Sequence, residues 1–223
     1  MEWSYEAWAS GEPYNWGGAL RGSSKYDAID FHVDLGCGTV KKGRIGIDHR
    51  QAPGVNIIMD LSNGQIHGMA TRPGDNANYQ SYHAHGFANE RWLPFEDGTI
   101  ESIISHHCLE HIGDGFLTLI DEVYRVLKPG GIFRPITPLF PSRTAVEDPD
   151  HRRYFMEKTW DCFCGGLGNA DHPTGCWLDS FSVPYTSARF ELLDKDITPP
   201  VQRDEEWGPN DAREIRVALR AVK

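Results

Sequence analysis

The chain has 223 residues, of which 32 are acidic and 22 are basic, so its formal net charge is −10 at neutral pH. This length suits one α/β domain with an apolar core of its own. The negative charge disfavours non-specific binding to nucleic-acid phosphates. No stretch has the length of a signal peptide's apolar run or the ~20 apolar residues of a membrane span. We expect a cytoplasmic protein without membrane contact, whose five cysteines are reduced.

The first part of the chain combines an irregular arm with a strand that ends in glycines. Residues 1–28 contain three tryptophans among glycine and serine without a clear period, which predicts an N-terminal arm or cap. Alternating apolar residues then predict a strand at 30–35. It stops at Gly36-Cys37-Gly38, where the missing side chains let a ligand approach the backbone.

Two more strands are predicted at 44–48 and 55–60, and the first of them ends at Asp48. A glycine turn beside a carboxylate at the end of the next strand predicts a nucleoside-binding site. Only eight residues separate Gly36 from Ile45, whereas parallel strands are usually joined by a dozen or more residues that include a helix. We therefore expect the first crossover helix to be reduced to a turn or absent.

The rest of the chain alternates regular elements with polar segments. Residues 61–91 are polar and turn-rich, which predicts a long insertion bordering the site. A strand at 99–105 and a helix at 115–127 follow, and the helix has apolar residues on one face. The sequence Lys-Pro-Gly-Gly at 128–131 is typical of a helix end. A strand at 132–136, an irregular substrate-side segment at 138–184, and two antiparallel strands at 189–197 and 214–222 complete the prediction.

Five segments in this order resemble one family. They are VDLGCG at 33–38, IGID at 45–48, LPFEDGTIESIISHHCLEHI at 93–112, EVYRVLKPGGIF at 122–133 and DPDHRRYF at 148–155. These segments resemble the class I S-adenosylmethionine-dependent methyltransferases of the small type 11 group. The resemblance implies an α/β fold, a Rossmann-like three-layer sandwich around a mostly parallel seven-stranded sheet with an antiparallel C-terminal strand. It also implies a single methyltransferase domain over residues 1–223.

The resemblance implies cofactor contacts at the ends of the first three strands and at the fourth. The residues concerned are Asp34, Gly36, Cys37, Gly38, Asp48, Asp60, Leu61 and Ser105. Asp48 would accept hydrogen bonds from both ribose hydroxyls, and Asp60 with Leu61 would lie at the adenine edge. Residues 87–90 are an alternative for the adenine contact. Without the first helix, Lys41 or Lys42 is an alternative contact for the carboxylate of the cofactor.

The predicted catalytic residues are His107 and His111, which follow the fourth strand and titrate near neutrality. The segment after the fifth strand supplies the predicted substrate contacts Asp150, His151 and Arg152, with Arg153 as an alternative to Arg152. For all of these residues a purely structural role is the competing interpretation.

The expected reaction is methyl transfer to a small-molecule or sugar-like acceptor. A nicotinamide-dependent enzyme is disfavoured because Lys41 replaces the third glycine of its fingerprint and Asp48 comes too early. A cofactor-binding subunit without turnover and a nucleic-acid methyltransferase remain alternatives. A zinc site formed by Cys162, Cys164, His172 and Cys176 has an unusually narrow first spacing, so we expect no metal.

Overall fold

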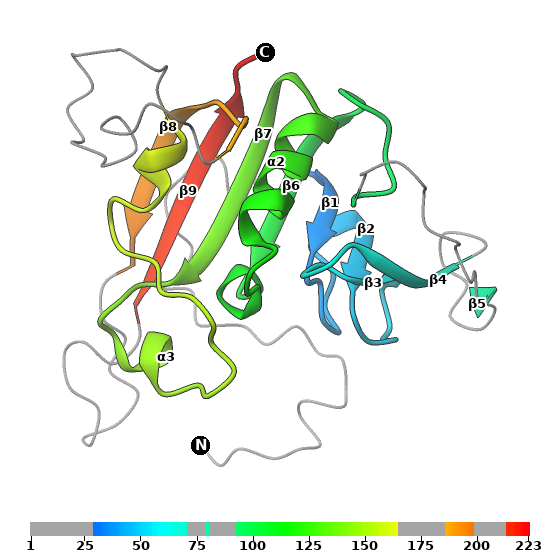
Figure 1. Ribbon diagram of the computed structural model, residues 1–223, viewed down its shortest axis with the longest axis horizontal. Coiled ribbons are helices and arrows are strands. Elements are labelled where there is room, and N and C mark those ends of the chain that lie inside the picture. Colours follow the sequence, from blue (N-terminus) through cyan, green and yellow to red (C-terminus); the bar gives the residue numbers. More distant parts are fainter. Residues whose placement is uncertain (1–28, 71–78, 81–91, 165–185, 199–212) are drawn as a thin grey trace.

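The computed structural model describes residues 29–70, 79–80, 92–164, 186–198 and 213–223, and these form one sheet with helical segments beside it (Figure 1). The sheet has nine strands in the order β5-β4-β3-β2-β1-β6-β7-β9-β8. Their bounds are β1 Phe31–Leu35, β2 Gly43–Asp48, β3 Val55–Asp60, β4 Gln65–Ala70, β5 Tyr79–Gln80, β6 Ile100–His106, β7 Leu127–Pro138, β8 Phe190–Ile197 and β9 Glu214–Ala221.

The centre of the sheet is parallel and its margins are antiparallel. Strands β3, β2, β1, β6 and β7 are joined by parallel pairing. At the C-terminal end of the chain β9 pairs antiparallel with β7 and β8 pairs antiparallel with β9, as the sequence predicts, and at the other margin β4 pairs antiparallel with β3 and β5. The predicted α/β class and mostly parallel sheet are therefore confirmed, with β4 and β5 as additional strands at the far edge.

The connection between β1 and β2 contains no helix. Residues 36–42 form turns and then enter β2 directly. Residues 49–54, between β2 and β3, likewise contain no helix. The shortened first crossover is thus a real feature of the fold.

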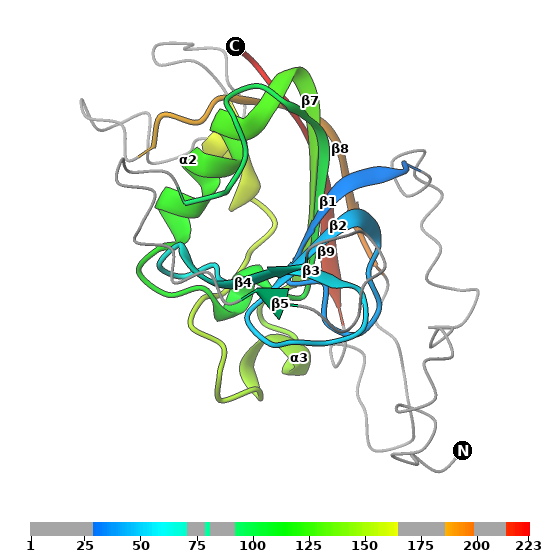
Figure 2. The same cartoon turned by 90° about the vertical axis from the view of Figure 1, so that its right-hand side faces the viewer.

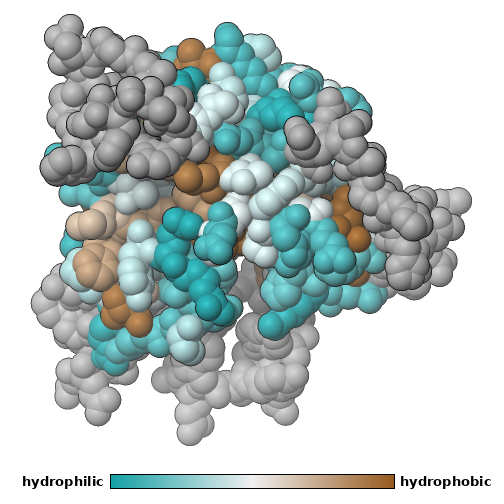
Figure 3. All heavy atoms as spheres, in the orientation of Figure 1, coloured by the Kyte–Doolittle hydropathy of each residue, from teal (hydrophilic) through white to brown (hydrophobic). Residues whose placement is uncertain are grey.

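Helix α2 (Phe116–Val126) packs against one face of the sheet (Figure 2). Leu119, Ile120 and Val123 are almost fully buried and belong to the same core cluster as Val33 of β1 and Phe133 of β7. In the orientation of Figure 1, the surface of the described residues is mostly hydrophilic, with apolar residues in scattered groups (Figure 3). One apolar face on a helix is what a sheet-covering helix requires.

The insertion predicted at 61–91 begins with a hairpin instead of an irregular loop. Strand β4 pairs antiparallel with β3, and the turn between them contains Asn63-Gly64. Gly64 has φ +76°, and Asp60 accepts hydrogen bonds from the Ser62 backbone N–H and the Asn63 amide. An Asn-Gly pair between alternating apolar residues is a strong hairpin signal, which the prediction of an irregular insertion overlooked.

Strand β7 begins at Leu127, directly after the helix, instead of at residue 132. The Lys-Pro-Gly-Gly segment is therefore part of the strand and coincides with a shift in its pairing to β6. Only short helices, α3 (Arg143–Val146) and η3 (Trp160–Phe163), occur between β7 and residue 164. The predicted arm at 1–28 and most of the 61–91 and 165–184 segments lie outside the described residues. Among described helices, none has the length and apolarity needed to cross a membrane.

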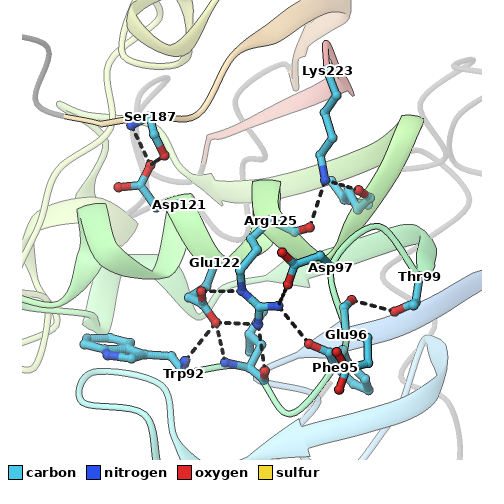
Figure 4. Close-up of polar contacts among 12 residues, drawn as sticks. Trp92, Phe95, Glu96, Asp97, Thr99, Asp121, Glu122, Arg125, Ser187 and Lys223 are labelled. Carbon is cyan, nitrogen blue, oxygen red and sulfur yellow. Dashed lines mark hydrogen bonds and ion pairs between the residues drawn. The ribbon is translucent and has the colours of Figure 1, made fainter. Parts of the chain in front are cut away.

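A buried ion pair attaches the segment before β6 to helix α2 (Figure 4). Glu122 accepts hydrogen bonds from the backbone N–H groups of Trp92 and Leu93, at 2.8 and 2.9 Å. Arg125 donates to both Glu122 oxygens, to the carbonyls of Leu93 and Phe95 and to Asp97. This network fixes the entry to β6, the strand that leads into the candidate site.

We predict that Glu122→Ala lowers the free energy of unfolding by about 3 kcal/mol, because it leaves two backbone N–H groups without their acceptor and a half-buried guanidinium with Asp97 as its remaining ion-pair partner. Urea unfolding followed by circular dichroism measures the change. The matched control is Glu101→Ala, which removes an exposed pair with Lys128 and should have little effect. Equal effects of the two substitutions would contradict this role of Glu122.

Candidate functional site

A cavity of about 450 Å³ lies at the carboxyl ends of the central strands. This size is within the range of small-molecule sites, and ligands of open α/β sheets bind at this edge. Its wall combines the turn after β1, the ends of β2 and β3, the segment after β6 and the loop after β7. The lining residues are Gly36, Gly38, Asp48, His49, Arg50, Met59, Asp60, Leu61, Ser62, His107, Cys108, His111, Ile112 and Asp150.

The glycine turn brings the backbone close to the segment after β6. Gly36 has φ +71°, and a Cβ atom built on it would lie 2.4 Å from both Cβ and Sγ of Cys108. The backbone N–H groups of Gly36 and Cys37 donate to the Ile47 carbonyl at 2.8 and 3.1 Å. Only glycine adopts this positive φ without strain and also lacks the Cβ atom that would overlap Cys108.

Asp48 closes the other side of the turn. Its Oδ2 accepts a hydrogen bond from the Gly38 backbone N–H at 2.9 Å, and its Oδ1 accepts one from the Arg50 backbone N–H at 3.0 Å. Each carboxylate oxygen has a second lone pair beyond these bonds, and the exposed His49 ring lies beside Oδ1, with Nδ1 at 3.2 Å. The group lines the cavity and can accept two hydroxyl hydrogen bonds there.

Two predicted cofactor residues lie beneath the turn instead of in the cavity wall. Asp34 is fully buried and accepts a hydrogen bond from the Lys42 backbone N–H at 2.6 Å. Burial raises the pKa of Asp34 to about 6, although the Lys42 contact opposes the shift. Burial also raises the pKa of the Cys37 thiol to about 12, which makes it an inert packing group. Both residues support the turn.

The remaining predicted cofactor residues divide between wall and interior. Asp60 and Leu61 line the cavity at the end of β3. Ser105 is fully buried and donates its hydroxyl hydrogen to the Leu35 carbonyl at 3.2 Å. Its side chain therefore joins β6 to β1, and the cofactor contact expected of Ser105 stays a prediction.

His107 lies in the cavity wall in a strained backbone conformation. Its φ is +51°, in the left-handed region, which few residues other than glycine adopt and in which asparagine, aspartate and histidine are over-represented. Its backbone N–H donates to the Ile136 carbonyl at 3.0 Å, and its Nε2 lies 3.0 Å from Glu214 Oε1. The His106 ring stacks on it, with centroids 4.5 Å apart. Strain of this kind costs about 1–3 kcal/mol and is concentrated at functional sites.

The charges around His107 set its protonation. Burial lowers the pKa of His107, but its hydrogen bond with Glu214 and the negative charges of Glu214 and Glu110 outweigh burial, so the pKa is raised. Burial opposes the shift of Glu214, yet the same hydrogen bond lowers the pKa of this carboxyl to about 2. Burial and the neighbouring His107 charge lower the pKa of His106 to about 3. His107 is thus the basic member of the pair.

A second polar group surrounds His111, which also lines the cavity. Asp150 Oδ2 lies 3.4 Å from His111 Nδ1, and the His151 ring packs edge-on against His111 with centroids 4.8 Å apart. His151 itself is buried behind the wall. Glu110 is almost fully buried, and burial raises the pKa of its carboxyl.

The cationic side chains considered for anion binding point elsewhere. Arg152 is exposed and lies 3.6 Å from Asp150, outside the cavity wall. Arg153 stacks on Phe116 and donates to the Gly113 carbonyl at 2.8 Å. Lys41 donates to the Arg44 carbonyl and to Asn56. In this structure Arg153 and Lys41 make contacts within the protein, and the substrate and cofactor contacts considered for them stay predictions.

The cysteine predictions require one correction. Cys37, Cys108 and Cys164 have free thiols, but Cys162 is disulfide-bonded. The expectation that all five thiols are reduced is wrong at Cys162, and a zinc set using its thiolate loses that ligand. His172 and Cys176 lie outside the described residues.

The sequence did not single out Glu214, the orienting partner of His107. Glu214 begins β9, more than a hundred residues after His107, and only the pairing of β9 with β7 places it beside the end of β6. No local motif marks such a contact. Met59, His49 and Cys108 also line the cavity but were not predicted, because the motifs pointed to the residues next to them in the sequence.

Comparison with known families matches residues 33–134 to the family described as methyltransferase domain. Comparison with curated proteins finds no significant match. Solved structures with similar folds include the MccD protein, with 12% identity, coverage of 89% of this chain and 93% of that chain, and a TM-score of 0.50.

Two further matches have lower TM-scores. A S-adenosylmethionine-dependent methyltransferase from Archaeoglobus fulgidus has 11% identity, coverage of 87% of both chains and a TM-score of 0.47. The 1,6-didemethyltoxoflavin-N1-methyltransferase of Burkholderia thailandensis, solved with S-adenosylhomocysteine, has 12% identity, coverage of 86% and 70%, and a TM-score of 0.46.

We predict that Gly36→Ala destabilises the protein by about 3 kcal/mol, because the new methyl group overlaps Cys108 and the positive φ is unfavourable for alanine. Urea unfolding measures this loss. Gly113→Ala is the matched control, since a Cβ atom there meets nothing within 4 Å and its φ is not positive. A Gly36→Ala protein as stable as the control would show that the turn relaxes freely.

Proposed function

We propose that this chain, whose residues 33–134 match the family described as methyltransferase domain, transfers a methyl group from S-adenosylmethionine to a small-molecule or sugar-like acceptor in the cavity described above. The observation that carries this proposal is the joint placement of the Gly36–Gly38 turn and the Asp48 carboxylate on one cavity wall. The cofactor supplies an electrophilic methyl group on a sulfonium.

The residues of the wall fit that cofactor. Asp48 would accept the two ribose hydroxyls through oxygens already oriented by backbone N–H groups. The absence of a side chain at Gly36 and Gly38 gives the ligand access to the backbone, and Asp60 with Leu61 would border the base. Holding donor and acceptor in line is worth roughly 7–11 kcal/mol of the barrier.

The charge of the wall favours a small acceptor over a polynucleotide. Asp48, Asp60 and Asp150 contribute carboxylates, whereas Arg50 is the only lysine or arginine among the lining residues. With the net charge of −10, this distribution repels a phosphate backbone. This charge distribution supports the proposed small acceptor.

We assign the general base to His107. Its Nε2 is held by Glu214 at 3.0 Å, which leaves Nδ1 to take the acceptor proton. Glu214 then stabilises the imidazolium that forms, in the manner of an acid that orients a catalytic histidine. His111 has only the exposed Asp150 at 3.4 Å, so its ring is less firmly oriented.

We predict that Asp48→Ala weakens S-adenosylhomocysteine binding roughly 100-fold, because hydrogen bonds to a charged acceptor contribute about 1.5–3 kcal/mol each. Isothermal titration calorimetry measures the affinity. Asp48→Asn retains one acceptor oxygen and should lose less, and Asp30→Ala, an exposed aspartate paired with Arg44, should bind normally. No binding by the unmodified protein would overturn the cofactor assignment.

The acceptor and the base are tested with a methyl-labelled donor and fractionated cell extract. Label should enter the small-molecule fraction; label in nucleic acid would overturn the acceptor class, and no label would overturn turnover. With the labelled acceptor in hand, His107→Ala should reduce kcat by about 100-fold or more while donor affinity stays unchanged. Undiminished turnover would remove His107 from the mechanism.

The pH dependence follows from the raised pKa of His107. A base must be neutral, so kcat/KM should rise with pH through a pKa above the ordinary histidine value of about 6.5. Glu214→Gln removes the main charge that raises this pKa; Glu110, His106 and Lys42 remain. The acid limb should move to lower pH by about one unit. An unshifted profile would contradict the assigned role of Glu214.

A further inference from the structure

Two groups of metal-ligating side chains occur among the described residues, and both adjoin the cavity. One contains His106, His107 and Glu214, and the other contains Glu110, His111 and His151. In each group the candidate ligand atoms lie within 4.8 Å of one another. The two groups differ in whether their carboxylate already has partners.

In the first group the carboxylate already has positively charged partners within the protein. Glu214 receives His107 Nε2 at 3.0 Å and two donors of Arg216, at 3.1 and 2.9 Å. These contacts neutralise its charge and occupy its oxygens. A cation would have to displace an arginine to bind there.

The carboxylate of the second group has no such partners. Glu110 is 1% exposed, and neither of its side-chain oxygens accepts a hydrogen bond from any residue that the structure describes. Burying a carboxylate without compensation costs several kcal/mol. The ligand atoms of two imidazoles, those of His111 and His151, lie within 4.8 Å of it and of one another, and imidazoles serve as metal ligands in their neutral form.

The two imidazoles are arranged as metal ligands commonly are. His151 Nδ1 lies 2.8 Å from the Ala145 carbonyl, and donating its hydrogen there leaves Nε2 with a free lone pair. Such a backbone contact to the second ring nitrogen fixes the tautomer of most metal-bound histidines. His111 Nδ1 is buried and makes no hydrogen bond within the described residues.

We infer that Glu110, His111 and His151 bind one divalent transition-metal ion at the wall of the cavity. One carboxylate and two imidazoles match the ligand preference of Zn²⁺, Co²⁺ and Fe²⁺. Ligands of a tetrahedral ion with bonds near 2.1 Å are about 3.4 Å apart. The ligand atoms of the three side chains must therefore move closer together by roughly an ångström when the ion binds. Asp150, 3.4 Å from His111, is placed to add a fourth oxygen.

This inference does not depend on methyl transfer, because binding of the ion is measured directly. Untagged full-length protein is treated with chelator, dialysed and titrated with Co²⁺ by calorimetry and by absorption spectroscopy. We expect one ion per chain and a spectrum without a thiolate charge-transfer band, which distinguishes this site from the cysteines. Absence of stoichiometric binding, or a thiolate band, would overturn the inference.

Matched variants locate the ion. Glu110→Gln and His151→Asn should each weaken Co²⁺ binding by more than about 100-fold, since even the outer partners of metal ligands account for about 10- to 100-fold. His67→Asn, an exposed histidine of β4, and His107→Asn, in the other group, should bind Co²⁺ as the unmodified protein does. Loss of binding in His107→Asn with retention in Glu110→Gln would place the ion in the other group and refute our assignment.

Folding of the variants is checked by circular dichroism without metal. If His151→Asn unfolds, the nearly isosteric Glu110→Gln decides the question, because it removes only a charge that has no hydrogen-bond partner in the described structure. Co²⁺ should raise the melting temperature of the unmodified protein and not that of Glu110→Gln. An equal rise in both would overturn the inference.

Discussion

The seven residues between β1 and β2 are the constraint on which the site depends. A fully extended seven-residue segment spans at most about 25 Å, and returning along the five-residue β1 requires about 17 Å. The same residues in a helix would rise only about 10 Å. The chain must therefore turn at once and run back nearly extended, which places glycines at the turn and brings the end of β2 against it.

Two carboxylates hold this connection in place from opposite sides. Asp34 anchors its far end through the Lys42 backbone N–H, and Asp48 anchors the turn through the Gly38 backbone N–H. A full crossover helix satisfies the backbone groups of its interior by i→i−4 hydrogen bonds, which this helix-free connection cannot form. Here side chains take over part of this task, so the carboxylate that can bind a ligand is also part of the structural support.

Much of the fold and half of the site follow from local sequence. The strands at β1, β2 and β3 and helix α2 could be predicted because alternation and helical period are local properties. The same holds for Gly36, Asp48 and His107, which stand in or beside recognisable motifs. Glu214 could not be found in this way, since its position depends on strand pairing across the whole sheet. The direction of the Ser105 hydroxyl, which donates to the Leu35 carbonyl, likewise depends on the pairing of β6 with β1.

The β4 hairpin shows that a local signal can also be overlooked. Asn63-Gly64 and the alternation that follows it predict a hairpin, but the surrounding polar segment dominated the interpretation. No sequence pattern predicts that Cys162 is disulfide-bonded or that Glu110 is buried without a hydrogen-bond partner among the described residues. Disulfide bonding and burial without partners are properties of the packed chain.

The hairpin also changes which strands of the sheet are open to pairing with another polypeptide. Because β4 pairs with β3, the outermost strands of the described sheet are β5 and β8. The two residues of β5 offer little backbone to an incoming strand, and β8 carries Glu191, Asp194, Lys195 and Asp196 along its length. Very short and charged edges are devices by which sheet proteins avoid edge-to-edge aggregation. The additional hairpin thus leaves a long twisted sheet with both of its edges protected.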